Sequence, residues 1–242
     1  MTPDPMLQDY PKSPRTEFCR HSLATRVTHW VNVVCLTILL GSGLQIFNAH
    51  PALYWGNDST FARPFVTLSD FPSWMTVPSY RDLGSGRMWH FFFAWMLVIN
   101  GTLYLLATVR SRHLSRDLLP TRAELRNIGH SLIEHARLRF PKGAEARRYN
   151  VVQQLTYLVV IFGLLPLIIL TGLCMSPYLN AVVPWQPAAF GGRQSARTLH
   201  FIAASGLVVF VLVHVAMVLL SGFVNNIRSI ITGCYVIEGE TR

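Results

Sequence analysis

Charged residues are scarce in this chain, and acidic residues are the scarcer sign. Of 242 residues 14% are charged, with 12 Asp and Glu against 21 Lys and Arg, while 51% are hydrophobic. The mean hydropathy is positive, at +0.33. Soluble globular domains usually carry about 25% charged residues. This shortage of charge argues against an ordinary soluble domain and predicts a membrane protein.

Cysteine is also scarce, and it follows no pattern. The four cysteines are widely separated, at Cys19, Cys35, Cys174 and Cys234. A framework of disulfides in a small domain needs closely spaced, regularly placed cysteines, and covalent attachment of a c-type haem needs C-x-x-C-H. Neither pattern occurs, so neither kind of protein is expected.

Long apolar runs dominate the sequence instead. A helix needs about 20 apolar residues to cross a hydrocarbon core of roughly 30 Å. Four stretches meet this requirement: 27–47, 88–109, 151–175 and 198–220. The sequence therefore predicts an all-α membrane protein built as a bundle of four transmembrane helices.

The polar ends of the chain frame this bundle. The first 25 residues are rich in proline and show no signal-peptide pattern, so we expect the first helix to be retained as an uncleaved anchor. The predicted organisation is an N-terminal segment at 1–25, a four-helix domain at 26–235 and a short tail at 236–242.

Basic residues predict the orientation in the membrane. Of the 21 Lys and Arg, ten lie in 110–148, four precede the first helix and two follow the fourth. By the positive-inside rule, both termini and the connection between helices two and three are cytoplasmic, which suits a bacterial inner membrane. These flanks account for the net charge of +9, so nucleic-acid binding is not expected.

Two connections between the helices carry features of their own. In the cytoplasmic connection, Thr121 and Glu124 form a T-x-x-E capping box before apolar residues at near-helical spacing. This pattern predicts an amphipathic helix lying on lipid headgroups. On the other side, residues 48–85 and 176–194 are rich in aromatic residues and proline. We expect them to form an outer cap near the headgroups.

Four of the nine histidines lie in or at the edge of the apolar helices. His29 and His214 lie toward the cytoplasmic side, and His90 and His200 toward the outer side. His200 and His214 are fourteen residues apart, which places them within roughly 40° on one helix face and about 21 Å apart along the axis. One face of the fourth helix can therefore serve two sites stacked across the membrane.

Two imidazoles per site fit the axial positions of a haem iron, because the porphyrin supplies the equatorial ligands. Structural zinc usually takes four protein ligands, and no cysteine lies beside either pair. The predicted cofactors are therefore two haem b, with His29, His90, His200 and His214 as iron ligands. A metal or proton transporter that uses intramembrane histidines is a further alternative, and the colour of the purified protein separates it from a cytochrome.

Three of these histidines follow an arginine at the same spacing, in R-V-T-H, R-M-W-H and R-T-L-H. Residues at i and i+3 share a helix face, and each arginine is closer to the membrane surface than its histidine. The pattern predicts that these arginines bind haem propionates at headgroup level. Snorkelling flanks are the alternative for each arginine taken singly. The three arginines are Arg26, Arg87 and Arg197.

This set of motifs resembles the bacterial cytochrome b561 family, including the b-type cytochrome subunits of thiosulfate reductases and nickel-iron hydrogenases. The likeness extends from about residue 18 to 235. It rests on the four histidines and on L-Q-I-F-N-A-H-P-A-L-Y-W-G (44–56), L-T-G-L-C-M-S-P (170–177) and F-G-G-R-Q-S-A-R-T-L-H-F (190–201).

The resemblance implies an electron conduit between ubiquinone or menaquinone and a periplasmic partner, either a molybdopterin oxidoreductase or a cytochrome c. The chain would then be the quinone-linked electron-transfer subunit of an oxidoreductase. A self-contained superoxide:quinone oxidoreductase is the alternative, since five outer arginines could steer an anion. For the quinone we expect Arg20, Asn150 and Gln153 at the cytoplasmic end, with Ser176, Arg193 and Gln194 at the outer end as the competing location.

Overall fold

The computed structural model describes residues 16–19, 21–61, 63–111, 119–126, 128–129, 131, 133 and 151–237. Four helical segments in this part of the chain are long and apolar enough to cross a membrane. They are α1 (Leu23–Phe47), α2 (Leu83–Arg110), the run Val151–Cys174, and α9 (Arg193–Leu220). The predicted all-α bundle of four transmembrane helices is confirmed, and each span matches its expected range to within five residues.

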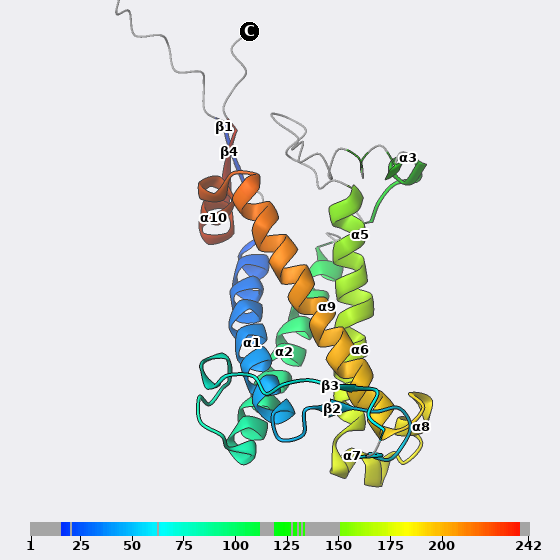
Figure 1. Cartoon of the computed structure of the whole chain (residues 1–242). Helices are drawn as coiled ribbons and strands as arrows, with labels where there is room; N and C mark the ends of the chain where they lie inside the picture. Colours follow the sequence, from blue (N-terminus) through cyan, green and yellow to red (C-terminus); the bar gives the residue numbers. More distant parts are fainter. Residues whose placement is uncertain are drawn as a thin grey trace, which may run out of the picture.

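The four spans run up and down between two distinct ends (Figure 1). The end that holds β1 (Thr16–Cys19), β4 (Cys234–Ile237) and α10 (Phe223–Thr232) is called the terminal end below, because the first and the last described residues lie there. The end that holds β2 (Ala52–Leu53), β3 (Val66–Thr67), α7 (Pro177–Val182) and α8 (Gln186–Ala189) is called the capped end. α1 packs along α2, and the second part of the third span, α6 (Leu165–Cys174), packs along α9.

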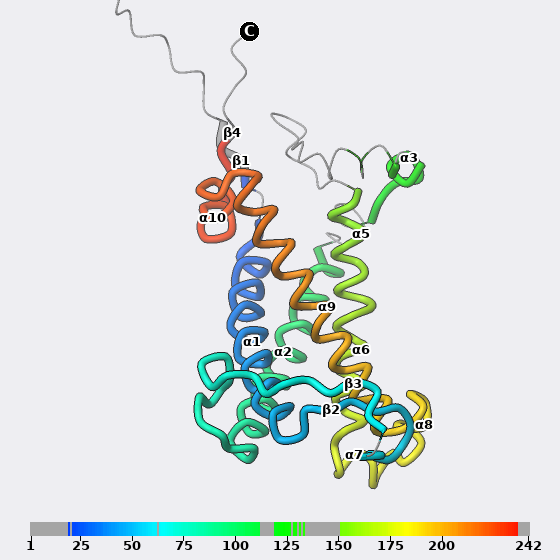
Figure 2. The backbone as a smooth tube through the Cα atoms, in the orientation of Figure 1, coloured from blue at the N-terminus to red at the C-terminus, as the bar shows by residue number. Residues whose placement is uncertain are grey.

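The third span is interrupted near its middle. It consists of α5 (Val151–Val159), a π-helical turn (Val160–Leu164) and α6 (Leu165–Cys174). Pro166 is the second residue after the turn. Its ring has no N–H to donate and collides with the carbonyl four residues earlier, which favours a local change in helix winding. On the terminal side of the π-helical turn, α5 diverges from α9. On the capped side, α6 stays packed against α9 (Figure 2).

Apolar side chains on the spans face outward as well as inward. Phe92, Leu106 and Leu212 are each about two-thirds exposed, at 64%, 64% and 65%. In water such exposure would be unfavourable, but lipid tails are as apolar as these side chains. The outer surface of the spans is therefore suited to contact with lipid.

The cap is a compact assembly of short elements at one end of the bundle. It contains the antiparallel pair β2 (Ala52–Leu53) and β3 (Val66–Thr67), the 3₁₀ turn η1 (Ser73–Met75), α7 (Pro177–Val182) and α8 (Gln186–Ala189). The expected cap is thus present, and it is tied to the start of α9. Thr198 donates to the Tyr54 carbonyl at 2.6 Å, and the Gly56 carbonyl accepts the backbone N–H of Gln194 at 2.9 Å.

The start of α2 is fixed by a capping carboxylate. Asp82 accepts the backbone N–H groups of Gly84 and Ser85, which satisfies two of the unpaired donors of the first turn. The Ser85 hydroxyl also donates to Asp82, and this side-chain hydrogen bond with the two backbone bonds lowers the pKa of the carboxyl. The negative charge is thereby maintained at the positive end of the helix dipole.

The terminal end carries three elements that the sequence pattern did not predict. β1 (Thr16–Cys19) pairs antiparallel with β4 (Cys234–Ile237), and α10 (Phe223–Thr232) connects β4 to the end of α9. In the basic connection, α3 (Arg122–Arg126) begins with the expected capping box, in which Thr121 N–H donates to the Glu124 carboxylate at 2.7 Å. The rest of the expected amphipathic helix lies mostly outside the described residues.

Gly192 and Gly222 offer a matched test of how the cap is held. Both have strongly positive φ, 113° and 114°, which costs other residues about 1–3 kcal/mol. A Cβ at Gly192 would also lie 2.4 Å from the Gly56 backbone, whereas at Gly222 it would meet nothing within 4 Å. We therefore expect Gly192→Ala to lower the thermal unfolding midpoint in detergent clearly more than Gly222→Ala. Equal shifts would show that backbone strain alone matters and that the Gly56 contact does not.

Candidate functional site

The first pair of intramembrane histidines lies toward the terminal end. His29 of α1 and His214 of α9 face each other with ring centroids 6.5 Å apart and a tilt of 52° between the rings. The edge of Trp30 lies against His29, with ring centroids 5.4 Å apart, and Phe210 stacks on His214 at 5.9 Å. Aromatic side chains thus surround this pair on both helices.

The second pair lies toward the capped end. His90 of α2 and His200 of α9 have ring centroids 6.2 Å apart and a tilt of 61°. The structure therefore brings together the same two pairs that the sequence placed at common depths. A single helix, α9, supplies one member of each pair.

Both separations leave room for one metal ion between the rings. Imidazole nitrogens bind metals at about 2 Å and lie about 1 Å from their ring centre, so an ion held between two of them separates the centroids by about 6 Å. Among the described residues, no group of three or more His, Cys, Asp and Glu is placed to hold a metal ion. Two imidazoles on opposite sides fit a cofactor that brings its own equatorial ligands, as haem does.

Hydrogen bonds in the capped-end pair fix which ring nitrogen is available. His200 Nδ1 lies 2.9 Å from the Ile168 carbonyl, which can only accept, so Nδ1 carries the proton. The Thr171 hydroxyl lies 3.2 Å from the same nitrogen and donates to the Leu167 carbonyl of its own helix. Nε2 of His200 is left with a lone pair, which is the state that a metal ligand needs.

His90 is oriented in a similar way from α1. Its Nδ1 lies 3.1 Å from the Ser42 hydroxyl oxygen, and this hydroxyl donates to the Ile38 carbonyl at 2.7 Å. Because the Ser42 proton is used there, its oxygen accepts from His90 Nδ1. Nε2 of His90 is then left with a lone pair, which is the state that a metal ligand needs.

Two glycines allow these rings to lie close to the neighbouring helices. A Cβ at Gly43 of α1 would lie 3.5 Å from His90 Cε1, and a Cβ at Gly172 of α6 would lie 3.2 Å from His200 Cε1. The second distance is tighter than ordinary van der Waals contact. Gly172 is therefore needed for close packing of α6 on the His200 ring.

The terminal-end pair is held differently. His29 Nδ1 is buried and has no hydrogen-bond partner among the described residues, and the same is true of Arg26 Nε one turn earlier. Next to His29, the Asn100 amide joins α2 to α1. It donates to the Thr28 carbonyl at 2.9 Å and to Asn32 Oδ1 at 2.8 Å. Buried groups without partners point to a bound group that would satisfy them.

The three arginines of the R-x-x-H motifs occupy different surroundings. Arg26 lies against Gly233: a Cβ added at Gly233 would lie 3.2 Å from Arg26 Nη1. Arg87 is exposed and lies over the Phe91 ring at 5.7 Å. Arg197 donates to the His50 carbonyl and lies over the Phe47 ring at 5.6 Å. A guanidinium has five N–H donors, so donors remain for a further partner in each case.

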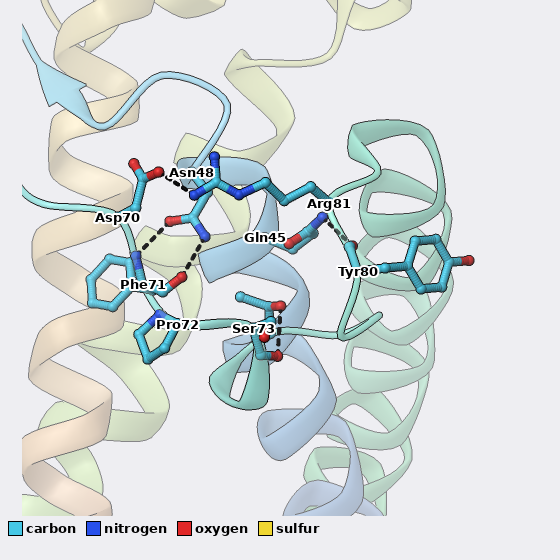
Figure 3. Close-up of a pocket in the computed structure, with 9 residues that line it drawn as sticks. Gln45, Asn48, Asp70, Phe71, Pro72, Ser73, Tyr80 and Arg81 are labelled. Carbon is cyan, nitrogen blue, oxygen red and sulfur yellow. Dashed lines mark hydrogen bonds and ion pairs between the residues drawn. The ribbon is translucent and has the colours of Figure 1, made fainter.

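A polar cavity of about 270 Å³ lies at the capped end beside the start of α2 (Figure 3). Its side chains mainly hold the loop that forms it. Gln45 donates to the Tyr80 carbonyl at 2.8 Å, Asn48 exchanges two hydrogen bonds with the Phe71 backbone, and Arg81 pairs with Asp70. The polar side chains around the cavity are thus engaged in holding the loop of the cap in place.

An apolar groove of about 440 Å³ lies where α5 diverges from α9. Thr156 and Val159 of α5 line one wall, and Gly206, Val209 and Phe210 of α9 line the other. Phe210 also stacks on His214. The groove therefore lies beside the terminal-end histidine pair.

The expected quinone residues are only partly within the described chain. Arg20 and Asn150 lie outside the described residues, and Gln153 lies in the first turn of α5, half-buried. At the capped end, the competing candidates are engaged in the cap. Arg193 donates to the Met175 carbonyl at 3.1 Å, and Gln194 donates to the Ser59 hydroxyl at 2.9 Å. Ser176 caps α7.

Several orienting residues were not identified from the sequence. Ser42, Gly43, Thr171 and Gly172 contact the capped-end histidines from α1 and α6. Thr171 and Gly172 lie in L-T-G-L-C-M-S-P, one of the motifs that carry the family resemblance, but the sequence alone predicts no role for either residue. Small and hydroxyl residues are common at helix contacts in membranes, so residue type alone does not single them out.

Comparison with known proteins points in the same direction as the geometry. The profile of the prokaryotic cytochrome b561 family matches residues 20–233. A protein of Azospira oryzae, named as a candidate protein-methionine-sulfoxide reductase subunit, YedZ1, is 34% identical over 195 residues. The matched region covers 81% of this chain and 87% of that relative.

The close contact at Gly172 gives a test of the capped-end site. Gly172→Ala would push a methyl group against the His200 ring. We expect the capped-end site then to bind its cofactor about 10-fold more weakly, as for other changes next to metal ligands. Haem content after gel filtration measures the effect. Gly163→Ala, in the same span with nothing within 4 Å of its Cβ, is the matched control and should retain full content. Full retention in Gly172→Ala would contradict the assigned role.

Proposed function

Because the chain belongs to the prokaryotic cytochrome b561 family, we propose that it is a di-haem subunit that exchanges electrons between membrane quinone and an oxidoreductase at the capped end. The chain is a multi-pass bacterial membrane protein and a b-type cytochrome of electron transfer. The proposal adds the number of haems, the quinone and the side on which each partner binds.

The observation that carries the proposal is the presence of two facing histidine pairs at two depths of one bundle. Their ring centroids are 6.5 Å and 6.2 Å apart, which suits one iron between each pair. Haem supplies a one-electron couple whose potential depends on its axial ligands, burial and hydrogen bonds. His29 and His214 would hold the terminal-end haem, and His90 and His200 the capped-end haem.

The protein's own contribution is to hold these rings ready to bind. At the capped end, the Ile168 carbonyl and the Ser42 hydroxyl keep Nδ1 of each histidine protonated and Nε2 available. Such partners typically raise ligand basicity and fix ring orientation. Arg26, Arg87 and Arg197, each three residues before a histidine, would bind the propionates and neutralise their charge.

Quinone is proposed to bind at the terminal end. Quinones are apolar with two carbonyl groups, so their site needs an apolar cleft with a few polar groups at its mouth. The groove between α5 and α9 is apolar and reaches Phe210, which stacks on His214. Gln153 lies in the first turn of α5, and Asn150 and Arg20 are neighbours in sequence of the described terminal end.

The redox partner is proposed to bind at the capped end, which the positive-inside rule predicts to be periplasmic. A molybdopterin oxidoreductase or a cytochrome c fits this role, and the relative named as a reductase subunit supports an oxidoreductase. The superoxide alternative relies on outer arginines that attract an anion. Arg81, Arg193 and Arg197 instead engage Asp70, Met175 and His50 within the cap, so this alternative has less support.

The number of haems is the first direct test. We expect a pyridine haemochrome assay on the purified protein to give two haem b per chain. His214→Ala should reduce this to one, because it removes a ligand of the terminal-end site only, and His90→Ala should remove the capped-end haem. A spectroscopic redox titration identifies which centre is lost.

His50→Ala is the matched control for these substitutions. His50 lies in the cap, where its Nε2 is 3.0 Å from the Tyr54 hydroxyl, and it faces neither pair. It should leave two haems in place. One haem or none in the unmodified protein would overturn the two-site proposal.

The side of the quinone site can be tested separately. Replacing Asn150 and Gln153 together by Leu removes the polar groups proposed to bind the quinone carbonyls. We expect at least a 10-fold slower reduction of the haems by a soluble quinol analogue, with haem content unchanged. Stopped-flow absorbance follows the reaction.

Gln194→Leu serves as the matched amide-to-apolar change at the capped end, where its amide holds Ser59. It should leave the quinol rate unchanged. A slower rate in Gln194→Leu with a normal rate in the double variant would move the quinone site to the capped end.

A further inference from the structure

Two cysteines meet where the ends of the chain pair. Cys19, the last residue of β1, stands directly opposite Cys234, the first residue of β4. Their Sγ atoms lie 3.9 Å apart although 215 residues separate them in sequence. Residues directly opposite each other in an antiparallel pair project to the same face of the ribbon.

From this juxtaposition we propose that Cys19 and Cys234 form a reversible disulfide that staples the N-terminal strand to the C-terminal strand. Opposed residues of antiparallel strands have Cα atoms about 4.5–5.5 Å apart. This lies within the range of about 4.4–6.8 Å that disulfides span. The bond can therefore form by rotation of the side chains, without moving the strands apart.

The surroundings position both thiols for this reaction. Asn225 of α10 exchanges two hydrogen bonds with Val236, at 2.7 and 3.1 Å, and so holds β4 on α10. Gly233 hydrogen-bonds to His21, which holds the same strand against the start of α1. Cys19 is exposed and accessible to a reagent, and Cys234 is half-buried.

The reaction partner is a low-molecular-weight disulfide. The Cys19 thiolate attacks one sulfur of that disulfide, forming a mixed disulfide and releasing one small thiol. The Cys234 thiolate then attacks the Cys19 sulfur and releases the second small thiol. Two protein thiols are oxidised, one external disulfide is reduced, and the two protons of the protein thiols end on the two released thiols.

The staple would act on the helices that carry the terminal-end histidines. β1 leads within four residues into α1, which bears His29, and β4 follows α10, which continues from α9 with His214. Arg26 lies against Gly233 at this junction. Oxidation therefore limits separation of α1 from the end of α9.

The test uses the purified full-length protein with oxidised glutathione as the probe and intact-mass spectrometry as the readout. The unmodified protein should lose two hydrogens without gaining glutathione, and dithiothreitol should reverse this. Cys19→Ser and Cys234→Ser should each instead gain one glutathione. Cys35 and Cys174 are fully buried and serve as unreactive internal controls.

Three outcomes would overturn the proposal: no reaction, glutathione on both cysteines of the unmodified protein, or a covalent dimer on a non-reducing gel. The coupling to the terminal end rests on the proposed function and has its own readout. Heat-induced loss of haem should occur at a higher temperature in the oxidised protein than in the reduced one. The double serine variant should show no such difference, and equal temperatures in the unmodified protein would refute the coupling while leaving the thiol chemistry standing.

Discussion

Hydrocarbon offers no hydrogen bonds, and this constraint governs how the bundle places its polar groups. The capped-end imidazoles are satisfied from neighbouring helices by the Ile168 carbonyl and the Ser42 hydroxyl. The hydroxyls of Ser42 and Thr171 in turn donate to carbonyls of their own helices. The Nδ1 atoms of this pair and the hydroxyls beside them are thus partnered within the protein, and the two capped-end rings are each held in one tautomer as a result.

The cap extends this control to the helix that serves both sites. Tyr54 and Gly56 accept hydrogen bonds from the start of α9, and the Gly56 N–H donates to Ser195 Oγ at 2.8 Å. These bonds satisfy groups at a helix terminus that would otherwise lack partners. Because α9 carries His200 seven residues after its first residue, the cap also fixes the position of the capped-end histidine pair along the bundle.

Much of this architecture could be predicted from the sequence, because long apolar runs and helix period are strong signals. The four spans and the pairing of histidines by depth follow from them. The strand pair of Cys19 and Cys234 could not be predicted, since four-residue strands 215 residues apart leave no periodic pattern. Ser42 and Thr171 were missed for another reason: hydroxyls in membrane helices usually bond to their own backbone, so only the tertiary structure shows which of them also meets an imidazole.

The two histidine pairs are not equivalent, and the difference follows the shape of the bundle. At the capped end α6 packs on α9, because Gly172 allows a close approach to the His200 ring. This contact places the Thr171 hydroxyl and the Ile168 carbonyl beside His200. Toward the terminal end α5 diverges from α9 beyond the π-helical turn, and His29 Nδ1 has no partner among the described residues. The close contact of α6 therefore orients one pair in advance. Beside the terminal-end pair, the divergence of α5 leaves a groove for an apolar ligand. The orientation of His29 and His214 therefore depends more on the group that binds between them.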